Sequence, residues 1–190
     1  MPSRRSVLLG ATAAALVVGG GLAGLSCRRF LARAQTRTGQ GSSVFEASFG
    51  TLEWGEAGQG PPVLMVHGTG GGFDQGLAFA HRLSADGYRI IAPSRFGYLR
   101  TAIPAEAGSA AQAAALVELL DHLGIDRIPV VGGSAGALSA IEFAVRHPAR
   151  CSALIAIVPA AYAPERSSYQ PMGAMQERLM RTMLNSDALF

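Results

Sequence analysis

The stretch Val130-Val131-Gly132-Gly133-Ser134-Ala135-Gly136 indicates the fold more strongly than any other part of the sequence. Two β-branched apolar residues are followed by a G-x-S-x-G pattern, and apolar residues at helical spacing come next. A tight turn from strand to helix strains its central residue, and it needs small residues two positions before and after. Gly132 and Gly136 meet that need. The pattern therefore predicts that Ser134 presents its hydroxyl group on such a turn, at the start of a helix that Pro148 ends.

A glycine-rich turn in which Ser134 only caps the next helix is the alternative interpretation. The chain has 24 glycines, so G-x-S-x-G can arise by chance. Pro129 favours this alternative, because proline fits poorly inside a central strand and is tolerated at a strand's first residue. The neighbouring elements favour the first interpretation.

Short apolar runs surround this motif. Residues 44–49 and 51–54 alternate around Gly50 and predict an antiparallel hairpin. Residues 62–66, 89–92 and 153–158 are nearly continuous apolar runs, which are typical of strands buried on both faces. The sequence therefore predicts an α/β fold, with a mostly parallel sheet flanked by helices on both faces and preceded by an N-terminal hydrophobic helix.

Helical patterns lie between these runs. One covers residues 75–84 and ends near Gly87. A second begins where Ser109 and Gln112 have the spacing of a capping box, and it ends at Gly124. Because ligands of such sheets bind beyond the carboxyl ends of the strands, we expect the functional residues there.

His67-Gly68-Thr69-Gly70-Gly71-Gly72 directly follows the strand predicted at 62–66. Acyl transfer needs two backbone N–H donors aimed at the developing oxyanion. We expect Ala135 to supply one and this loop the other, from Thr69 in the first place and Gly70 in the second. Gly68, Gly70 and Gly133 are expected to line the substrate. We expect His67 to hold the loop in place and not to act as the catalytic base.

The first forty residues differ from the rest. Residues 7–25 carry no charge and are long enough, as a helix, to approach the thickness of a bilayer. They predict membrane association through a single N-terminal helix, its side undetermined. The Arg4-Arg5 pair resembles a twin-arginine export signal, which is the alternative. Ala32-Arg33-Ala34 would suit cleavage of a signal, so whether the segment is removed stays open.

Composition limits the possible partners. At 190 residues and 49% apolar content the chain can form one globular domain. Six of its sixteen basic residues precede Gly41 and no acid does, which leaves the remainder slightly acidic and argues against nucleic acid as a partner. The G-x-G-x-x-G at Gly19 lies inside the apolar run, without the strand that a dinucleotide site requires, so we expect no cofactor and no metal. Two cysteines, Cys27 and Cys151, form no disulfide framework.

Residues 50–164 resemble a bacterial α/β-hydrolase of the kind that carries a cap domain. The His67-Gly68 loop, the segment Ala92-Pro93-Ser94-Arg95-Phe96-Gly97-Tyr98 and the turn at Ser134 occur in the family's order and spacing. Ser94 stands where many members have aspartate. The resemblance implies a hydrolase with a serine nucleophile, which excludes the aspartate chemistry of dehalogenases and epoxide hydrolases. Ester, thioester, amide, lactone or activated C–C bonds remain as substrates.

The same resemblance implies a triad of serine, acid and histidine, with the histidine after the last strand. The four histidines, His67, His81, His122 and His147, all precede that place, and Glu165 is a weak candidate for the acid. We therefore expect a C-terminally truncated core, divided into residues 1–40 (signal anchor or export segment and linker), 41–164 (core) and 165–190 (start of the cap). Two strands of the sheet are expected to be missing. The alternatives to a small-molecule serine hydrolase are a non-catalytic remnant or ligand-binding module and a cofactor-free perhydrolase.

Overall fold

The computed structural model describes residues 41–160 and 173–184, together with residues 21, 24–29, 32 and 36. The chain divides into two compact units, Thr38–Pro164 and a second unit made of Met1–Arg37 and Glu165–Phe190. In the second unit, α6 covers Ala174–Leu184, within the stretch expected to open a cap. The division predicted from the sequence into three segments stays a prediction.

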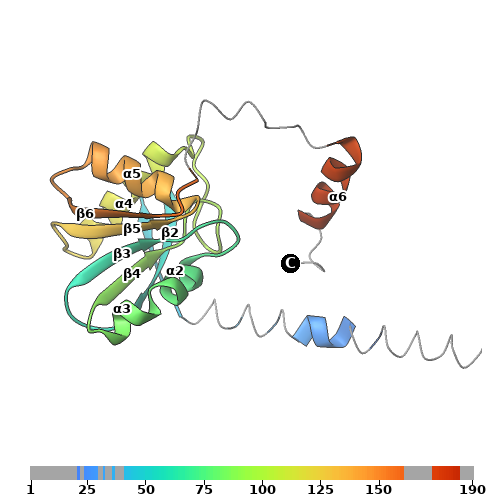
Figure 1. The fold of residues 1–190 in the computed structure, drawn as a ribbon, viewed down its shortest axis with the longest axis horizontal. Coiled ribbons are helices and arrows are strands. Elements are labelled where there is room, and N and C mark those ends of the chain that lie inside the picture. The colour runs from blue at the N-terminus through green and yellow to red at the C-terminus, as the bar shows by residue number, and fades with distance from the viewer. Residues whose placement is uncertain are drawn as a thin grey trace, which may run out of the picture. The chain divides into compact units, whose positions relative to one another are not determined.

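A six-stranded sheet runs through the Thr38–Pro164 unit in the order β1-β2-β4-β3-β5-β6 (Figure 1). Its strands are β1 (Ser43–Ala47), β2 (Gly50–Ala57), β3 (Pro62–Val66), β4 (Arg89–Pro93), β5 (Ile128–Gly133) and β6 (Cys151–Ile157). β1 and β2 form the predicted antiparallel hairpin, and β4, β3, β5 and β6 pair in parallel. The α/β fold with a mostly parallel sheet is thus confirmed.

Side chains of the central strands alternate between two apolar layers. In β3, Leu64 and Val66 join the larger cluster, whereas Val63 and Met65 join the smaller one. Helices α4 (Ser109–His122) and α5 (Gly136–Arg146) cover one face of the sheet, and α2 (Phe73–Phe79) and α3 (His81–Ala85) cover the other (Figure 1). Burial on both faces explains why these strands are continuous apolar runs.

Two local predictions are wrong. The pattern at 75–84 gives two helices, α2 and α3, that meet at Ala80, and not one. The capping box is absent: Gly108 is the N-cap of α4 without a side-chain cap, and Ser109 is already helical. The Gln112 carboxamide accepts a hydrogen bond from the Phe96 amide instead. A hydrogen bond to the distant Phe96 thus takes the place of the expected capping contact with Ser109.

β6 is an edge strand whose apolar side chains are largely exposed, among them Leu154, Ile155 and Ile157.

Pro129 lies at an irregularity in the pairing of β5 with β6, where a missing N–H donor does least harm to the ladder. The strand is therefore compatible with its proline.

The predicted membrane association is wrong on this structure. Across the described residues, no helix is both long and apolar enough to cross a bilayer. Of the apolar stretch 7–25, only residues 21, 24 and 25 are described, and they are helical. The remainder of that stretch and the Arg4-Arg5 pair lie outside the described residues.

Candidate active site

Ser134 lies between the end of β5 and the start of α5 and has a backbone φ of +49°. Non-glycine residues seldom adopt this left-handed conformation, which costs on the order of 1–3 kcal/mol. Neighbouring backbone holds it in place: the Ser134 amide donates to the Ile157 carbonyl at 2.9 Å, and the Ser134 carbonyl accepts from Ala160 at 3.1 Å. The side chain is exposed. The turn predicted from G-x-S-x-G is thus present, with an accessible hydroxyl group at its tip.

The glycines around Ser134 are required by close packing. A Cβ atom added at Gly132 would lie 2.6 Å from the Cα of Ala137. One added at Gly136 would overlap the carbonyl oxygens of Val66 and His67. Because these neighbours are backbone atoms, they cannot move aside cheaply. The two small positions predicted from the sequence are therefore small for the expected reason.

The loop after β3 lies against this turn. A Cβ added at Gly68 would stand 3.2 Å from the Cβ of Ser134. Thr69 and Gly70 are exposed, and in the described part of the chain the amides of Thr69, Gly70 and Ala135 donate to no backbone carbonyl. Ala135 is also the N-cap of the eleven-residue α5, whose N-terminus favours negative charge. The arrangement can present N–H donors beside Ser134 from two separate elements.

His67 is fully buried and bridges two segments. Its Nε2 atom accepts from the Arg95 amide at 2.9 Å, which leaves Nδ1 to donate to the Gly68 carbonyl at 2.7 Å. Burial, aided by the positive charge of Arg95, lowers the pKa of His67 to about 4. With its one lone pair already engaged, the ring cannot take a proton from Ser134. The expectation that His67 holds the loop in place is confirmed.

Ser94 belongs to a buried polar cluster that the sequence did not reveal. Its hydroxyl donates to Oε2 of the buried Glu53 at 2.9 Å and accepts from the Phe73 amide at 3.0 Å. Arg100 Nε binds the other oxygen of Glu53 at 2.8 Å. The cluster fixes the start of α2 and the loop after β4. An aspartate at position 94 would bring a second negative charge against Glu53, which explains why serine suits this chain.

Among the described residues, the other three histidines have partners away from Ser134. His81 begins α3, and its ring contacts the Ala78 carbonyl. His122 ends α4 and stacks on Phe45. His147 caps α5, and Glu165 lies outside the described residues. Within the described ranges, no hydrogen bond links the Ser134 hydroxyl to a basic group.

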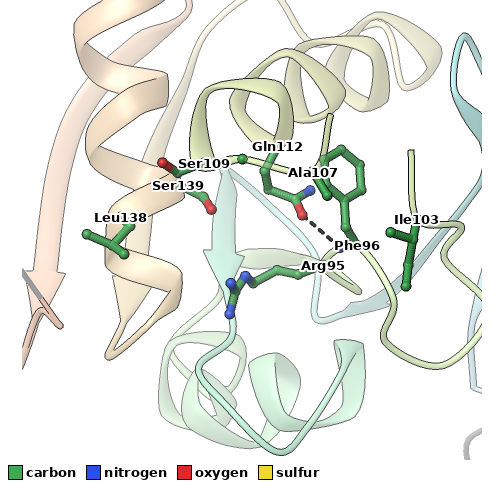
Figure 2. Close-up of a pocket in the computed structure, with 9 residues that line it drawn as sticks. Arg95, Phe96, Ile103, Ala107, Ser109, Gln112, Leu138 and Ser139 are labelled. Carbon is green, nitrogen blue, oxygen red and sulfur yellow. Dashed lines mark hydrogen bonds between the residues drawn. The ribbon is translucent and has the colours of Figure 1, made fainter. Parts of the chain in front are cut away.

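Sequence reasoning missed a pocket of about 220 Å³ between the loop after β4 and the first turns of α4 and α5 (Figure 2). Its lining is Arg95, Phe96, Ile103, Ala107, Gly108, Ser109, Gln112, Leu138 and Ser139. The available signal was position, because Arg95 follows the carboxyl end of a parallel strand, where ligands of such sheets bind.

A mostly parallel sheet, a strained serine between strand and helix, and a glycine loop packed against that serine are features of the α/β-hydrolase fold. The chain belongs to the α/β-hydrolase fold family, which it matches over residues 61–188.

Among relatives, the chain is 32% identical over 122 residues to a 2-hydroxy-6-oxo-6-phenylhexa-2,4-dienoate hydrolase of Burkholderia cepacia, a match that covers 62% of this chain and 43% of the relative. A solved α/β-hydrolase fold protein from Nakamurella multipartita is 32% identical with a TM-score of 0.61, covering 75% of this chain and 52% of that one. The N-acyl homoserine lactonase AidH, solved with N-butanoyl homoserine, is 27% identical with a TM-score of 0.57, covering 70% and 50%. The chain thus spans about half the length of the relatives it matches.

Proposed function

We propose that this chain is a serine hydrolase in which Ser134 attacks the carbonyl carbon of an ester, lactone or related small-molecule substrate. The observation that carries the proposal is the positive φ of Ser134, which holds an exposed hydroxyl at the start of α5. A residue is kept in such a conformation only where the surrounding structure imposes it, and active sites are where this occurs most.

In this mechanism the Ser134 hydroxyl loses its proton to a base as its oxygen bonds to the carbonyl carbon. The carbonyl oxygen becomes an oxyanion, which the amides of Ala135 and Thr69 stabilise, with Gly70 as the alternative second donor. Each such donor contributes on the order of 3 kcal/mol in related chemistry. Gly68 and Gly133 leave room for the substrate beside the serine. Collapse of the tetrahedral intermediate breaks the carbon–oxygen bond to the leaving group, which takes up that proton and departs as an alcohol, and water then hydrolyses the acyl-serine to the free serine and an acid.

The described residues supply no base for the serine, and the family's histidine follows a strand later than β6. Where a triad is incomplete, oxyanion stabilisation and binding alone leave a residual acceleration of about 10³-fold over water. A non-catalytic module that retains the site to hold a ligand is the second candidate. A cofactor-free perhydrolase would use the same residues.

A fluorophosphonate probe on the full 190-residue chain tests the proposal, because it reacts only with an activated serine. We expect labelling of the wild-type chain and of Ser152→Ala, which alters an exposed serine on β6. Ser134→Ala should not be labelled, while circular dichroism shows that all three proteins are folded. A folded wild-type chain that takes up no label, or a label that survives Ser134→Ala, would refute the serine mechanism. Peroxide-dependent turnover of acetate would identify the perhydrolase.

A further inference from the structure

The pocket of Figure 2 holds donors that have no acceptor. In Arg95, both Nε and Nη1 are buried without a hydrogen-bond partner, and so is Nε2 of Gln112. Gln112 is only 3% exposed. Its orientation is fixed, because its carboxamide oxygen accepts from the Phe96 amide at 2.7 Å, and the –NH₂ group therefore remains as the unpaired end. Buried donors left unpaired destabilise the fold, and charged ones do so more strongly.

The Arg95 guanidinium lies over the Tyr98 ring, 5.7 Å from its centroid, and not against a carboxylate. No aspartate or glutamate is among the pocket's lining residues, so the Arg95 guanidinium has no carboxylate there. The pocket also includes Ser109, at the start of the fourteen-residue α4, and Gly108, which caps that helix without a side chain. The free amides of a helix N-terminus add further partial positive charge. The Arg95 guanidinium, the unpaired Gln112 –NH₂ group and the helix N-terminus therefore favour an anionic acceptor.

We propose that this pocket binds a carboxylate group attached to a short apolar chain. A volume of about 220 Å³ lies below the ~300–1,000 Å³ of pockets for drug-sized ligands, so the occupant is small. Phe96, Ile103 and Leu138 supply apolar surface beside the donors, and Ser139 from α5 points toward them (Figure 2). The carboxylate accepts from Arg95 and Gln112 while the chain packs on the apolar side.

The pocket is mechanically linked to the candidate active site. The Arg95 amide donates to His67, and the His67 ring holds Gly68 of the loop that touches Ser134. Leu138 lies one helical turn beyond Ser134. As a subsite of the proposed hydrolase, the pocket would select substrates that carry an acid group. This part of the inference rests on the proposed function, whereas binding of the acid itself does not.

The test titrates butanoate and its neutral isostere butanamide into the full chain, and follows the Arg95 Nε–H and Gln112 side-chain NH₂ resonances by NMR. We expect saturable shifts with butanoate, with a dissociation constant on the order of 1 mM, and none with butanamide. Arg95→Met should weaken binding at least tenfold. Gln112→Glu should abolish butanoate binding, because it places a carboxylate beside Arg95. This second variant keeps the test decisive if Arg95→Met fails to fold. Arg82→Met, an exposed arginine on α3, should change nothing.

Equal resonance shifts with butanoate and butanamide, or shifts that do not saturate with butanoate, would overturn the proposal. The unpaired donors would then be satisfied by water and not by a carboxylate. Tighter binding of inorganic phosphate than of butanoate would overturn the carboxylate assignment. Turnover shows whether the acid group belongs to the substrate or to a separate ligand. If the chain cleaves the 4-nitrophenyl monoester of glutaric acid faster than 4-nitrophenyl butanoate, and Arg95→Met loses this preference, the acid group belongs to the substrate. Butanoate binding without that preference assigns it to a separate ligand. If neither ester is cleaved, the proposed hydrolase fails while the titration still decides the pocket.

Discussion

The buried His67 ring predicts a stability that falls on acidification. Its pKa is about 4 in the folded chain, mainly because of burial, against about 6.5 in the unfolded chain. Between these values the unfolded chain binds the extra proton, so the free energy of unfolding decreases as pH falls through 6.5 and reaches its full loss below 4. This difference in the pKa of His67 corresponds to about 3 kcal/mol, of which roughly 2 kcal/mol is lost between pH 7.5 and pH 5.

Urea unfolding of the wild-type chain and of His67→Gln at these two pH values measures the stability that is lost through protonation of His67. Glutamine does not titrate, so the variant should lose about 2 kcal/mol less than the wild type on acidification, whatever its stability at pH 7.5. Ser152→Ala replaces an exposed side chain that does not titrate and should leave the wild-type pH dependence unchanged. Equal pH dependence of the wild type and His67→Gln would contradict the reasoning. So would an NMR spectrum in which the neutral His67 ring carries its proton on Nε2, since Nε2 accepts from Arg95 here.

Two further predictions concern the turn at Ser134 and use the same unfolding assay. Ser134→Gly should raise the free energy of unfolding by about 0.5–1 kcal/mol, because relief of the left-handed strain outweighs the greater freedom of glycine in the unfolded chain; a loss of stability would mean that the turn is not strained. Gly136→Ala should lower the free energy of unfolding by about 1–3 kcal/mol, because its new methyl group would overlap the carbonyl oxygens of Val66 and His67. The control Gly108→Ala, whose added atom meets nothing within 4 Å, should lower the free energy of unfolding by less than about 1 kcal/mol. Similar losses of stability in Gly136→Ala and Gly108→Ala would refute the packing argument.

Much of this architecture could be predicted because it depends on local chemistry. Buried parallel strands must be apolar throughout, and the turn at Ser134 needs small residues at Gly132 and Gly136, so both are visible in the sequence. The role of His67 followed from its place at a strand's end. These features need no knowledge of which strands become neighbours.

Other features could not be predicted, because their partners are far apart in the chain. Gln112 had the spacing of a capping residue, yet the Phe96 amide binds it across sixteen positions. Glu53 occupies a strand position that alternation alone does not distinguish from a solvated one, whereas Ser94 and Arg100 surround its carboxylate. The unpaired donors of Arg95 appear only once the loop after β4 is folded against α4 and α5. Tertiary hydrogen bonds, not propensity, decide these positions.

The shape of the candidate active site depends on a strand that lies at the edge of the sheet. The strained backbone of Ser134 is held on both sides by the end of β6, through the Ile157 carbonyl and the Ala160 amide. Val158, between them, is itself a β-branched residue at a φ of +45°, so this connection stores strain as well. Loss of the pairing between β5 and β6 would release both residues to relaxed conformations and withdraw the serine from its turn. Because the side chains of β6 are largely exposed, the strand that holds the conformation of Ser134 is itself only partly packed.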